Sequence, residues 1–584
     1  ENSDLTNSTA SSQIIVNKEA SAGMYAKMSG ASSVPKTSKN EGKIEIKADG
    51  AGKSAAMYSL MENGTTKVMT TKNTKDIEVA QKTSAGIYVK NESAQDKNNS
   101  LAENTGSIKM TGESSVGIIA EKSKVTNSGT GANGIEISGN NSAGILATKE
   151  SEVTNSGRIE GNTGTKLVGI SVDETSTVIN SGSIIMNTAQ NTGIVSKGGQ
   201  VTNSGTITLV KNNSTGISAE NADVTNTATI KAKDKESVGI YAKMSGNVDK
   251  KVTNTGTITL ESPAGTTPNK SAAIYSLVDG GTGTGILTTE NNETINVDQK
   301  DSVGIFAQNN GTANTRSVVK NTKIINVSKE GSAGIYAKNN TGTNTNSVVE
   351  NKADIKVTKQ GSAAILGEKS DITNYETKGV ITLSAFKSAG IIGNNDSTVS
   401  NAGKIETTVV SPTKAEEGLV GISLNASTGT NETTGTISLG TAYSTGMFGE
   451  ASSTLTNAGS ITGDKQKAVG MAAKASTATN NSGATITLSG ANSTGMFGLA
   501  VGSTKSTLTN SGTINGNGEG AVGIAVNDSK ATNSKNATIN LTAKKSTGIF
   551  GEVGSIVTNA GKIETTTASP TTTEEGLVGI SLNA

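Results

Sequence analysis

The chain has 584 residues, of which 70 are glycine, 32% are hydrophobic and 2% are aromatic, so it offers little large apolar surface for compact globular cores. It contains no histidine, cysteine or tryptophan, which excludes imidazole catalysis, thiol nucleophiles, disulfides and the usual zinc sites, and no cofactor is expected. Because 51 basic residues are balanced by 50 acidic ones and form no basic run, nucleic-acid binding is not expected.

A five-residue block recurs along the chain, as in Ser21-Ala-Gly-Met-Tyr25, Ser84-Ala-Gly-Ile-Tyr88 and Ser332-Ala-Gly-Ile-Tyr336. We count 21 copies, in which the glycine, or the alanine that replaces it in three of them, recurs about every 28 residues on average. Such a period is typical of repeat proteins, in which each unit contacts only its neighbours. Block glycines predicted to be structural are Gly144, Gly169, Gly193 and Gly216.

A second block lies between many copies of the first, as in Val153-Thr-Asn-Ser-Gly-Arg-Ile159 and Val201-Thr-Asn-Ser-Gly-Thr-Ile207. In the unit from Val201 to Ser218, apolar residues alternate with polar ones as in half-buried strands, and Gly and Asn fall where the chain must turn. The sequence therefore predicts an all-β chain, a right-handed parallel β-helix (β-solenoid) of about 21 coils with roughly three short strands per coil, continuous over residues 1–584. Disorder is the alternative for a chain of this composition, but β-branched residues at fixed positions favour the β-helix.

Stacked coils would align the asparagines of the second block, so that their side-chain amides hydrogen-bond along the axis as an asparagine ladder. Asparagines that face solvent in turns are the alternative. The predicted members of the ladder are Asn155, Asn180, Asn203 and Asn226.

We expect function to lie in loops that depart from the minimal coil. Two related insertions, near 307–318 and 337–348, fall on adjacent coils, so their asparagines would stack and offer amide donors and acceptors to glycan hydroxyls. Two merely soluble loops are the alternative. The predicted ligand-binding residues are Asn309, Asn310, Arg316, Asn339 and Asn340. Other insertion loops are expected near 61–76, 91–101, 261–269, 407–417 and 565–575.

The register of these two insertions also places Lys320 opposite Glu350 on the next coil. We predict a cross-coil ion pair there, worth about 0.2 to 1 kcal/mol.

A β-helical polysaccharide-degrading enzyme is a further alternative, because such enzymes work with carboxylates clustered on one face. Acidic residues such as Asp173, Glu174, Glu416 and Glu417 lie in irregular stretches rather than at one position of every unit. Solvated loops explain this distribution better, so no enzymatic activity is expected.

Over nearly the whole chain, the alternation of SAGIYA with VTNSGTI resembles the passenger domains of fusobacterial type V autotransporter adhesins. The resemblance implies a cell-surface adhesin segment or stalk, tethered to the outer membrane through a C-terminal β-barrel not included in this chain, or secreted as a passenger. It implies a host-cell glycan or protein receptor, or a partner bacterial surface, as the binding partner. A pure spacer that projects a distal tip is the alternative. No apolar stretch approaches the roughly 18 residues of a membrane helix, so direct membrane insertion of this segment is not expected.

Overall fold

The computed structural model describes residues 1–30, 34–262, 269–280, 283–312, 314–376, 378–408, 412–566 and 576–583. In these residues the regular structure consists of 63 β-strands and three 3-10 helices of three residues each, η1 (Lys97–Asn99), η2 (Asn344–Asn346) and η3 (Ala415–Glu417). None of the helices found in this part of the chain is long and apolar enough to cross a membrane. The fold is an all-β right-handed parallel β-solenoid with three sheets, as the sequence predicts.

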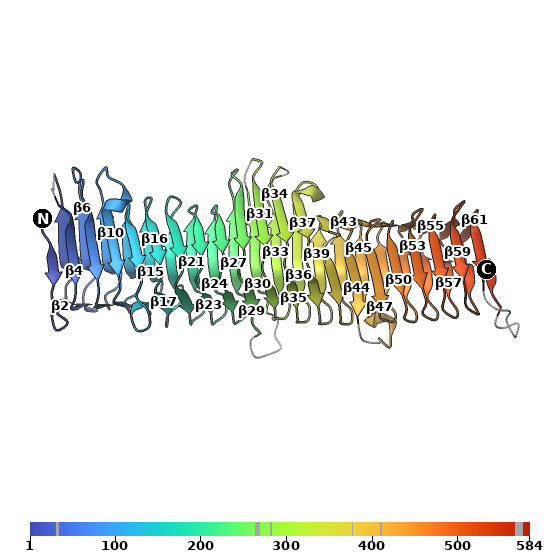
Figure 1. Cartoon of the computed structure of the whole chain (residues 1–584), viewed down its shortest axis with the longest axis horizontal. Coiled ribbons are helices and arrows are strands. Elements are labelled where there is room, and N and C mark those ends of the chain that lie inside the picture. The colour runs from blue at the N-terminus through green and yellow to red at the C-terminus, as the bar shows by residue number, and fades with distance from the viewer. Residues whose placement is uncertain are drawn as a thin grey trace. The chain divides into compact units, whose positions relative to one another are not determined.

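The chain divides into two compact units, which we describe separately. Unit 1 contains Glu1–Gly281 and Leu287–Glu293, and unit 2 contains Thr282–Ile286 and Thr294–Ala584. Within each unit, every third strand belongs to the same sheet, so three consecutive strands form one coil and strands of one sheet lie side by side (Figure 1). We call the sheets A, B and C after the first, second and third strand of each coil. Continuity of the solenoid across the two units stays a prediction.

One coil of unit 1 shows how the sequence pattern becomes structure. It consists of β22 (Val201–Asn203), β23 (Ile207–Leu209) and β24 (Thr215–Glu220). These strands pair in parallel with β25 (Val224–Asn226), β26 (Ile230–Ala232) and β27 (Val238–Met244) of the next coil. Like residues fall opposite each other, and the predicted apolar positions are fully buried in the interior. They are Val201, Ile207, Leu209 and Ile217.

The block glycine is favoured because neighbouring coils approach closely at that position, although alanine takes its place in three copies. A Cβ atom on Gly193 of β21 (Thr192–Lys197) would lie 2.6 Å from the backbone oxygen of Gly216 in the next coil. A Cβ atom on Gly144, Gly169 or Gly216 would lie 2.6, 2.5 or 2.4 Å from the backbone oxygen of the block glycine that follows. The predicted structural role of these glycines therefore has a steric cause.

The predicted asparagine ladder is present in sheet A and lies inside the solenoid. Asn155 Nδ2 donates to Asn180 Oδ1 at 2.6 Å, Asn180 Nδ2 to Asn203 Oδ1 at 2.7 Å, and Asn203 Nδ2 to Asn226 Oδ1 at 2.7 Å. All four side chains are fully buried, so the alternative of solvent-facing asparagines is wrong here. Each buried amide gains a partner on the neighbouring coil, which removes the cost of burying it.

The predicted insertion loops differ in how they are ordered. The loop near 61–76 joins β6 (Ala55–Met61) to β7 (Met69–Asn73), and those near 91–101, 337–348 and 407–417 contain η1, η2 and η3. Residues 263–268 of the 261–269 loop, 313 of the 307–318 loop, 409–411 of the 407–417 loop and 567–575 of the 565–575 loop lie outside the described residues.

Candidate functional site

The predicted loop site lies in unit 2, between β33 (Val303–Asn309) and β34 (Arg316–Asn321) and between β36 (Ala333–Asn339) and β37 (Ser347–Asn351). The register does place Asn309 beside Asn339. However, Asn309 is fully buried, and its Nδ2 donates to the backbone oxygens of Thr315 and Asn346, both at 3.0 Å. Its Oδ1 accepts from the Gly311 backbone N–H at 3.0 Å.

Asn339 is also buried. Its Nδ2 donates to the Thr343 backbone oxygen at 2.6 Å, and its Oδ1 accepts from the Thr341 N–H. Asn309 and Asn339 therefore hold their own loops in shape, as asparagine does in many turns. Their predicted role as ligand contacts is wrong for this structure, because their amides do not face solvent.

The other three predicted residues lie nearer the surface. Asn340 and Arg316 are exposed, and Asn310 is half-buried. Asn340 Nδ2 donates to Asn310 Oδ1 at 2.6 Å, and Arg316 Nε donates to the Thr345 backbone oxygen at 3.2 Å. A ligand role for these three residues stays a prediction.

Lys320 and Glu350 are directly opposite each other in the paired strands β34 and β37, as predicted. The predicted ion pair between them does not form. The Glu350 carboxylate instead lies 3.4 Å from Lys352 Nζ, in the same segment of chain. An exposed ion pair gains so little that the nearer lysine decides the pairing.

A row of tyrosines on sheet C of unit 1 was not predicted from the sequence. Tyr25 in β3 (Ala22–Met28), Tyr58 in β6 and Tyr88 in β9 (Ala85–Asn91) fall opposite one another on three successive coils. The ring centroids of Tyr25 and Tyr58 are 5.4 Å apart, and those of Tyr58 and Tyr88 are 5.0 Å apart. Stacking at this distance is favourable between aromatic rings.

A shift in the strand alternation brings small residues next to this row. In β9, Ala85, Gly86 and Ile87 are all buried and Tyr88 is half-buried, so the alternation shifts, and Ala85 and Tyr88, three residues apart, line the same outer groove. The groove has a volume of about 500 Å³. Its floor is Ala22, Ala55 and Ala85, one side is the tyrosine row, and the other side is the corner that precedes each strand. We call it the tyrosine groove.

The corner residues fix the second side of the groove. Ala20, Lys53 and Thr83 have backbone φ angles of 51°, 65° and 53°, so the chain turns sharply just before each strand of sheet C. The corners are tied together across coils, because the Ser21 N–H donates to Ser54 Oγ and the Ser54 N–H donates to Ser84 Oγ, both at 3.2 Å. The groove is therefore built on hydrogen-bonded backbone rather than on a separate loop.

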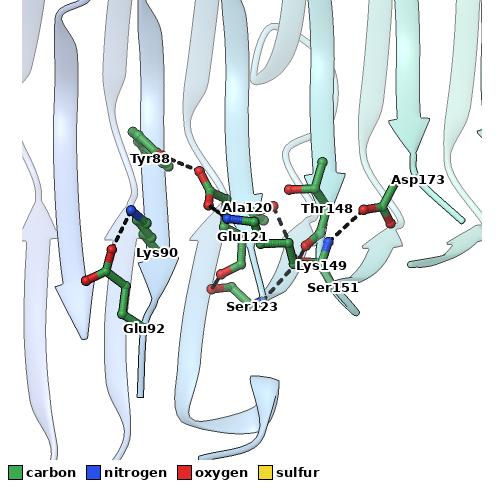
Figure 2. A network of polar contacts seen from close by, with 10 residues as sticks. All are labelled: Tyr88, Lys90, Glu92, Ala120, Glu121, Ser123, Thr148, Lys149, Ser151 and Asp173. Atoms are coloured by element: carbon green, nitrogen blue, oxygen red, sulfur yellow. Dashed lines mark hydrogen bonds and ion pairs between the residues drawn. The ribbon is translucent and has the colours of Figure 1, made fainter. Parts of the chain in front are cut away.

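Ile119 of β12 (Val116–Glu121) replaces the aromatic residue on the fourth coil and ends the row. There Tyr88 donates its hydroxyl hydrogen bond to the Glu121 carboxylate, which also accepts from Lys149 Nζ at 2.6 Å (Figure 2). Burial alone would raise the pKa of Glu121, but the hydrogen bonds from Lys149 and Tyr88 outweigh it and hold that pKa below its ordinary value. Burial and the bond to Glu121 both raise the pKa of Tyr88, so its hydroxyl stays a donor.

The charges around the tyrosine groove are largely neutralised in pairs. Lys90 Nζ lies 2.5 Å from the Glu92 carboxylate (Figure 2), and Lys27 Nζ lies 3.1 Å from that of Glu62. Within the described part of the chain, Lys53 makes no ion pair. The hydroxyls of Tyr25 and Tyr58 have no hydrogen-bond partner among the described residues, so they are available to a ligand.

Similar aromatic pairs occur elsewhere without the same floor. In unit 1, Tyr241 and Tyr275 have ring centroids 5.3 Å apart, but Val238 occupies the floor position of the first coil. In unit 2, Phe306 and Tyr336 stack at 4.9 Å, and Tyr336 donates to Glu368 at 2.6 Å just as Tyr88 donates to Glu121. The combination of three consecutive tyrosines with three alanines distinguishes the tyrosine groove.

A sequence signal for the tyrosine row did exist. Ten of the 13 aromatic residues stand two positions after the block glycine or its alanine replacement. The clustering of so rare a residue type at one position of the repeat indicates an outer stripe, and the three consecutive tyrosines mark its first coils.

The acidic residues considered for catalysis do not gather into a metal site. Among the described residues, no group of three or more Asp or Glu side chains could hold a metal ion. Asp173 accepts from the Lys149 backbone N–H at 2.8 Å, and Glu417 accepts from the Thr413 N–H at 2.9 Å. Both carboxylates therefore stabilise turns.

One family model matches the chain, that of the BigA third pectate lyase-like domain, over residues 163–286 and 342–523. These segments make up more than half of the 584 residues. The chain belongs to this family. The assignment points to a bacterial surface protein with a β-helix passenger. Neither a curated protein nor a solved structure matches the chain at a significant level.

The tyrosine groove lies outside both segments that match the BigA-type family model, since its lining runs from Ala20 to Ile119. The family assignment therefore describes the coils that follow the groove and supplies no role for the groove itself.

Proposed function

We propose that this chain is a non-enzymatic adhesin segment of a bacterial surface protein and that it holds its partner in the tyrosine groove. The observation that carries the proposal is the outer row of Tyr25, Tyr58 and Tyr88 beside a floor of alanines. Tyr25, on the first coil, is 50% exposed, and Tyr58 and Tyr88 on the next two coils are half-buried, so all three rings present a face to the groove. Aromatic residues of this kind supply large contact area at low entropic cost in binding sites.

The family assignment supports a place on the cell surface. In our proposal the segment belongs to an autotransporter passenger that is tethered to the outer membrane or released from it. Its partner is a host-cell glycan or protein receptor, or the surface of a partner bacterium. Because the carboxylates of Glu62, Glu92 and Glu121 are each paired with a lysine, they are poorly suited to acid catalysis.

Attachment of beads that carry the full chain to panels of host cells and bacteria tests this function. The triple variant Tyr25→Ala/Tyr58→Ala/Tyr88→Ala should lose most of the attachment. The matched control is Tyr241→Ala/Tyr275→Ala, which removes a similar aromatic contact in the same unit and leaves the tyrosine groove intact. It should attach like the parent chain.

The same assay separates the alternatives. If the triple variant attaches normally while Asn310→Ala/Arg316→Ala/Asn340→Ala does not, the loop site predicted from the sequence is the binding site. If no variant changes attachment, or the parent chain does not attach, the segment is a spacer. Release of sugar from glycans by the purified chain would instead favour the polysaccharide-degrading alternative.

A further inference from the structure

The tyrosine groove presents the same chemical set three times in succession. Each of the first three coils contributes an alanine methyl to the floor, a tyrosine ring to one side and a serine-bearing corner to the other. Adjacent strands of a sheet lie about 4.8 Å apart, so the set recurs at about that distance along the solenoid axis. The ring spacings of 5.4 and 5.0 Å follow the same period.

A ligand that fits every coil equally must repeat at the same distance. An extended peptide does not, because its like-facing side chains recur every two residues, or about 6.6 Å. An extended chain of pyranose sugars advances by nearly one strand spacing per unit, so one sugar unit can lie opposite each successive coil.

The surface chemistry of the groove also matches a sugar. The tyrosine rings can cover the C–H faces of a sugar beside the largely buried alanine floor, and the Tyr25 and Tyr58 hydroxyls can each donate and accept a hydrogen bond. Lys27, Lys90 and Lys149 are paired with carboxylates, which leaves Lys53 as the unpaired charge in the lining. Lys53 is one charged side chain among thirteen lining residues, so the surface that a ligand meets consists mainly of uncharged groups, which suits an uncharged ligand.

One end of the groove lies at the fourth coil. On the fourth coil the floor position is Val116 and the aromatic position is Ile119, while Tyr88 is held by Glu121. The repeated set therefore ends after three coils.

We propose that the tyrosine groove binds a linear chain of uncharged hexose units that lies along the solenoid axis, with one sugar opposite each of three coils. This inference rests on the proposed function, since it assigns a ligand class to the same site. It predicts that the binding affinity depends on the length and charge of the oligosaccharide, which a nonspecific apolar surface would not show.

Titration of the full chain with neutral gluco-, manno- and galacto-oligosaccharides of one to six units tests the inference. Because the chain has no tryptophan, its fluorescence comes from eight tyrosines, three of which line the groove, and a change that is lost in the groove variants reports on the groove. For at least one neutral series, affinity should rise with each added unit up to three and then level off. Polygalacturonate fragments of equal length should bind more weakly.

Two variants make the titration specific. Tyr58→Ala should weaken binding by about fivefold, which corresponds to one aromatic contact. Ala55→Val fills the floor with the residue type found at the equivalent position of the fourth coil, Val116, so it should fold normally and still weaken binding. Tyr241→Ala is the control and should bind like the parent chain.

The outcomes separate this inference from the proposed function. If no neutral oligosaccharide binds, or if affinity does not depend on length, the hexose-chain inference is overturned. Should attachment to cells still depend on the three tyrosines in that case, the groove binds a protein receptor and the proposed function stands. Stronger binding of the acidic fragments would also overturn the inference.

Discussion

Unit 1 contains two rows of side chains that run along the coils, one inside and one outside. The asparagine ladder of sheet A is buried, and Asn155, Asn180 and Asn203 each donate to the next asparagine. The tyrosine row of sheet C is outside and ends after three coils at Ile119. The inner row is thus repeated for stability, whereas the outer row changes from coil to coil.

This difference distinguishes residues that stabilise every coil of the solenoid from residues that form a binding surface on a few coils. Substitutions in the inner positions should reduce stability wherever they are made. Substitutions in the outer row should affect binding at one place and change stability little. The following predictions are arranged from the largest expected effect to the smallest.

The strongest effect should come from the closest contact between coils. Gly193→Val should lower the free energy of unfolding by about 3 kcal/mol, because its side chain would overlap the Gly216 backbone oxygen and push the coils apart. Urea denaturation followed by circular dichroism measures the change. Thr192→Val on the same strand is the control, and an equal loss in both variants would contradict the steric explanation.

The asparagine ladder should be nearly as sensitive. Asn203→Ala leaves Asn226 Oδ1 and Asn180 Nδ2 without their ladder partner inside the solenoid, which should cost about 2 kcal/mol. The same denaturation measurement, with Thr202→Ala as the control, checks this value. A loss no larger than that of the control would mean that the ladder adds no stability.

A single tyrosine of the outer row should matter less for stability. Tyr58→Ala removes two ring contacts from a half-buried site and should lower the free energy of unfolding by about 1 kcal/mol. Tyr25→Ala removes one ring contact and should cost less. Melting temperatures of the two variants test the order, and a larger loss for Tyr25→Ala would contradict the stacked arrangement.

The smallest effect concerns pH. Since its pKa is lowered in the folded state, Glu121 adds stability above the ordinary glutamate value of about 4.3 and loses it as pH falls through the lowered value. Because the site is partly exposed to solvent, we expect the contribution to be below about 1 kcal/mol. The melting temperature of Glu121→Gln, compared with the parent chain from pH 7 to pH 3, measures it. A constant difference between the two proteins over that range would contradict this pairing.

The fold was predictable because its determinants are local and repeated. The alternation in Ile207-Thr-Leu209 gave the bounds of β23, and the recurring Asn203 and Gly193 reflect contacts that every coil makes with the next. A position that recurs in register across coils therefore reveals its environment without a structure.

The candidate site was not predictable in the same way. The burial of Asn309 and Asn339 depends on loops that fold back onto their own backbone, which spacing alone does not reveal. The tyrosine groove depends on two adjacent buried residues that shift the strand alternation, so Ala85 and Tyr88 share one surface although three residues separate them. The row was visible in the sequence as clustered tyrosines, but the groove was not.

Chemical labelling of tyrosine hydroxyls in the full chain, with and without cells to which it attaches, tests the central proposal most directly. Peptide mass spectrometry then compares each tyrosine before and after attachment. We predict that Tyr25 and Tyr58 become protected, whereas Tyr375 and Tyr443, which lie outside the tyrosine row, are labelled equally in both states. Unchanged labelling of Tyr25 and Tyr58 on attached protein would contradict a binding role for the tyrosine groove.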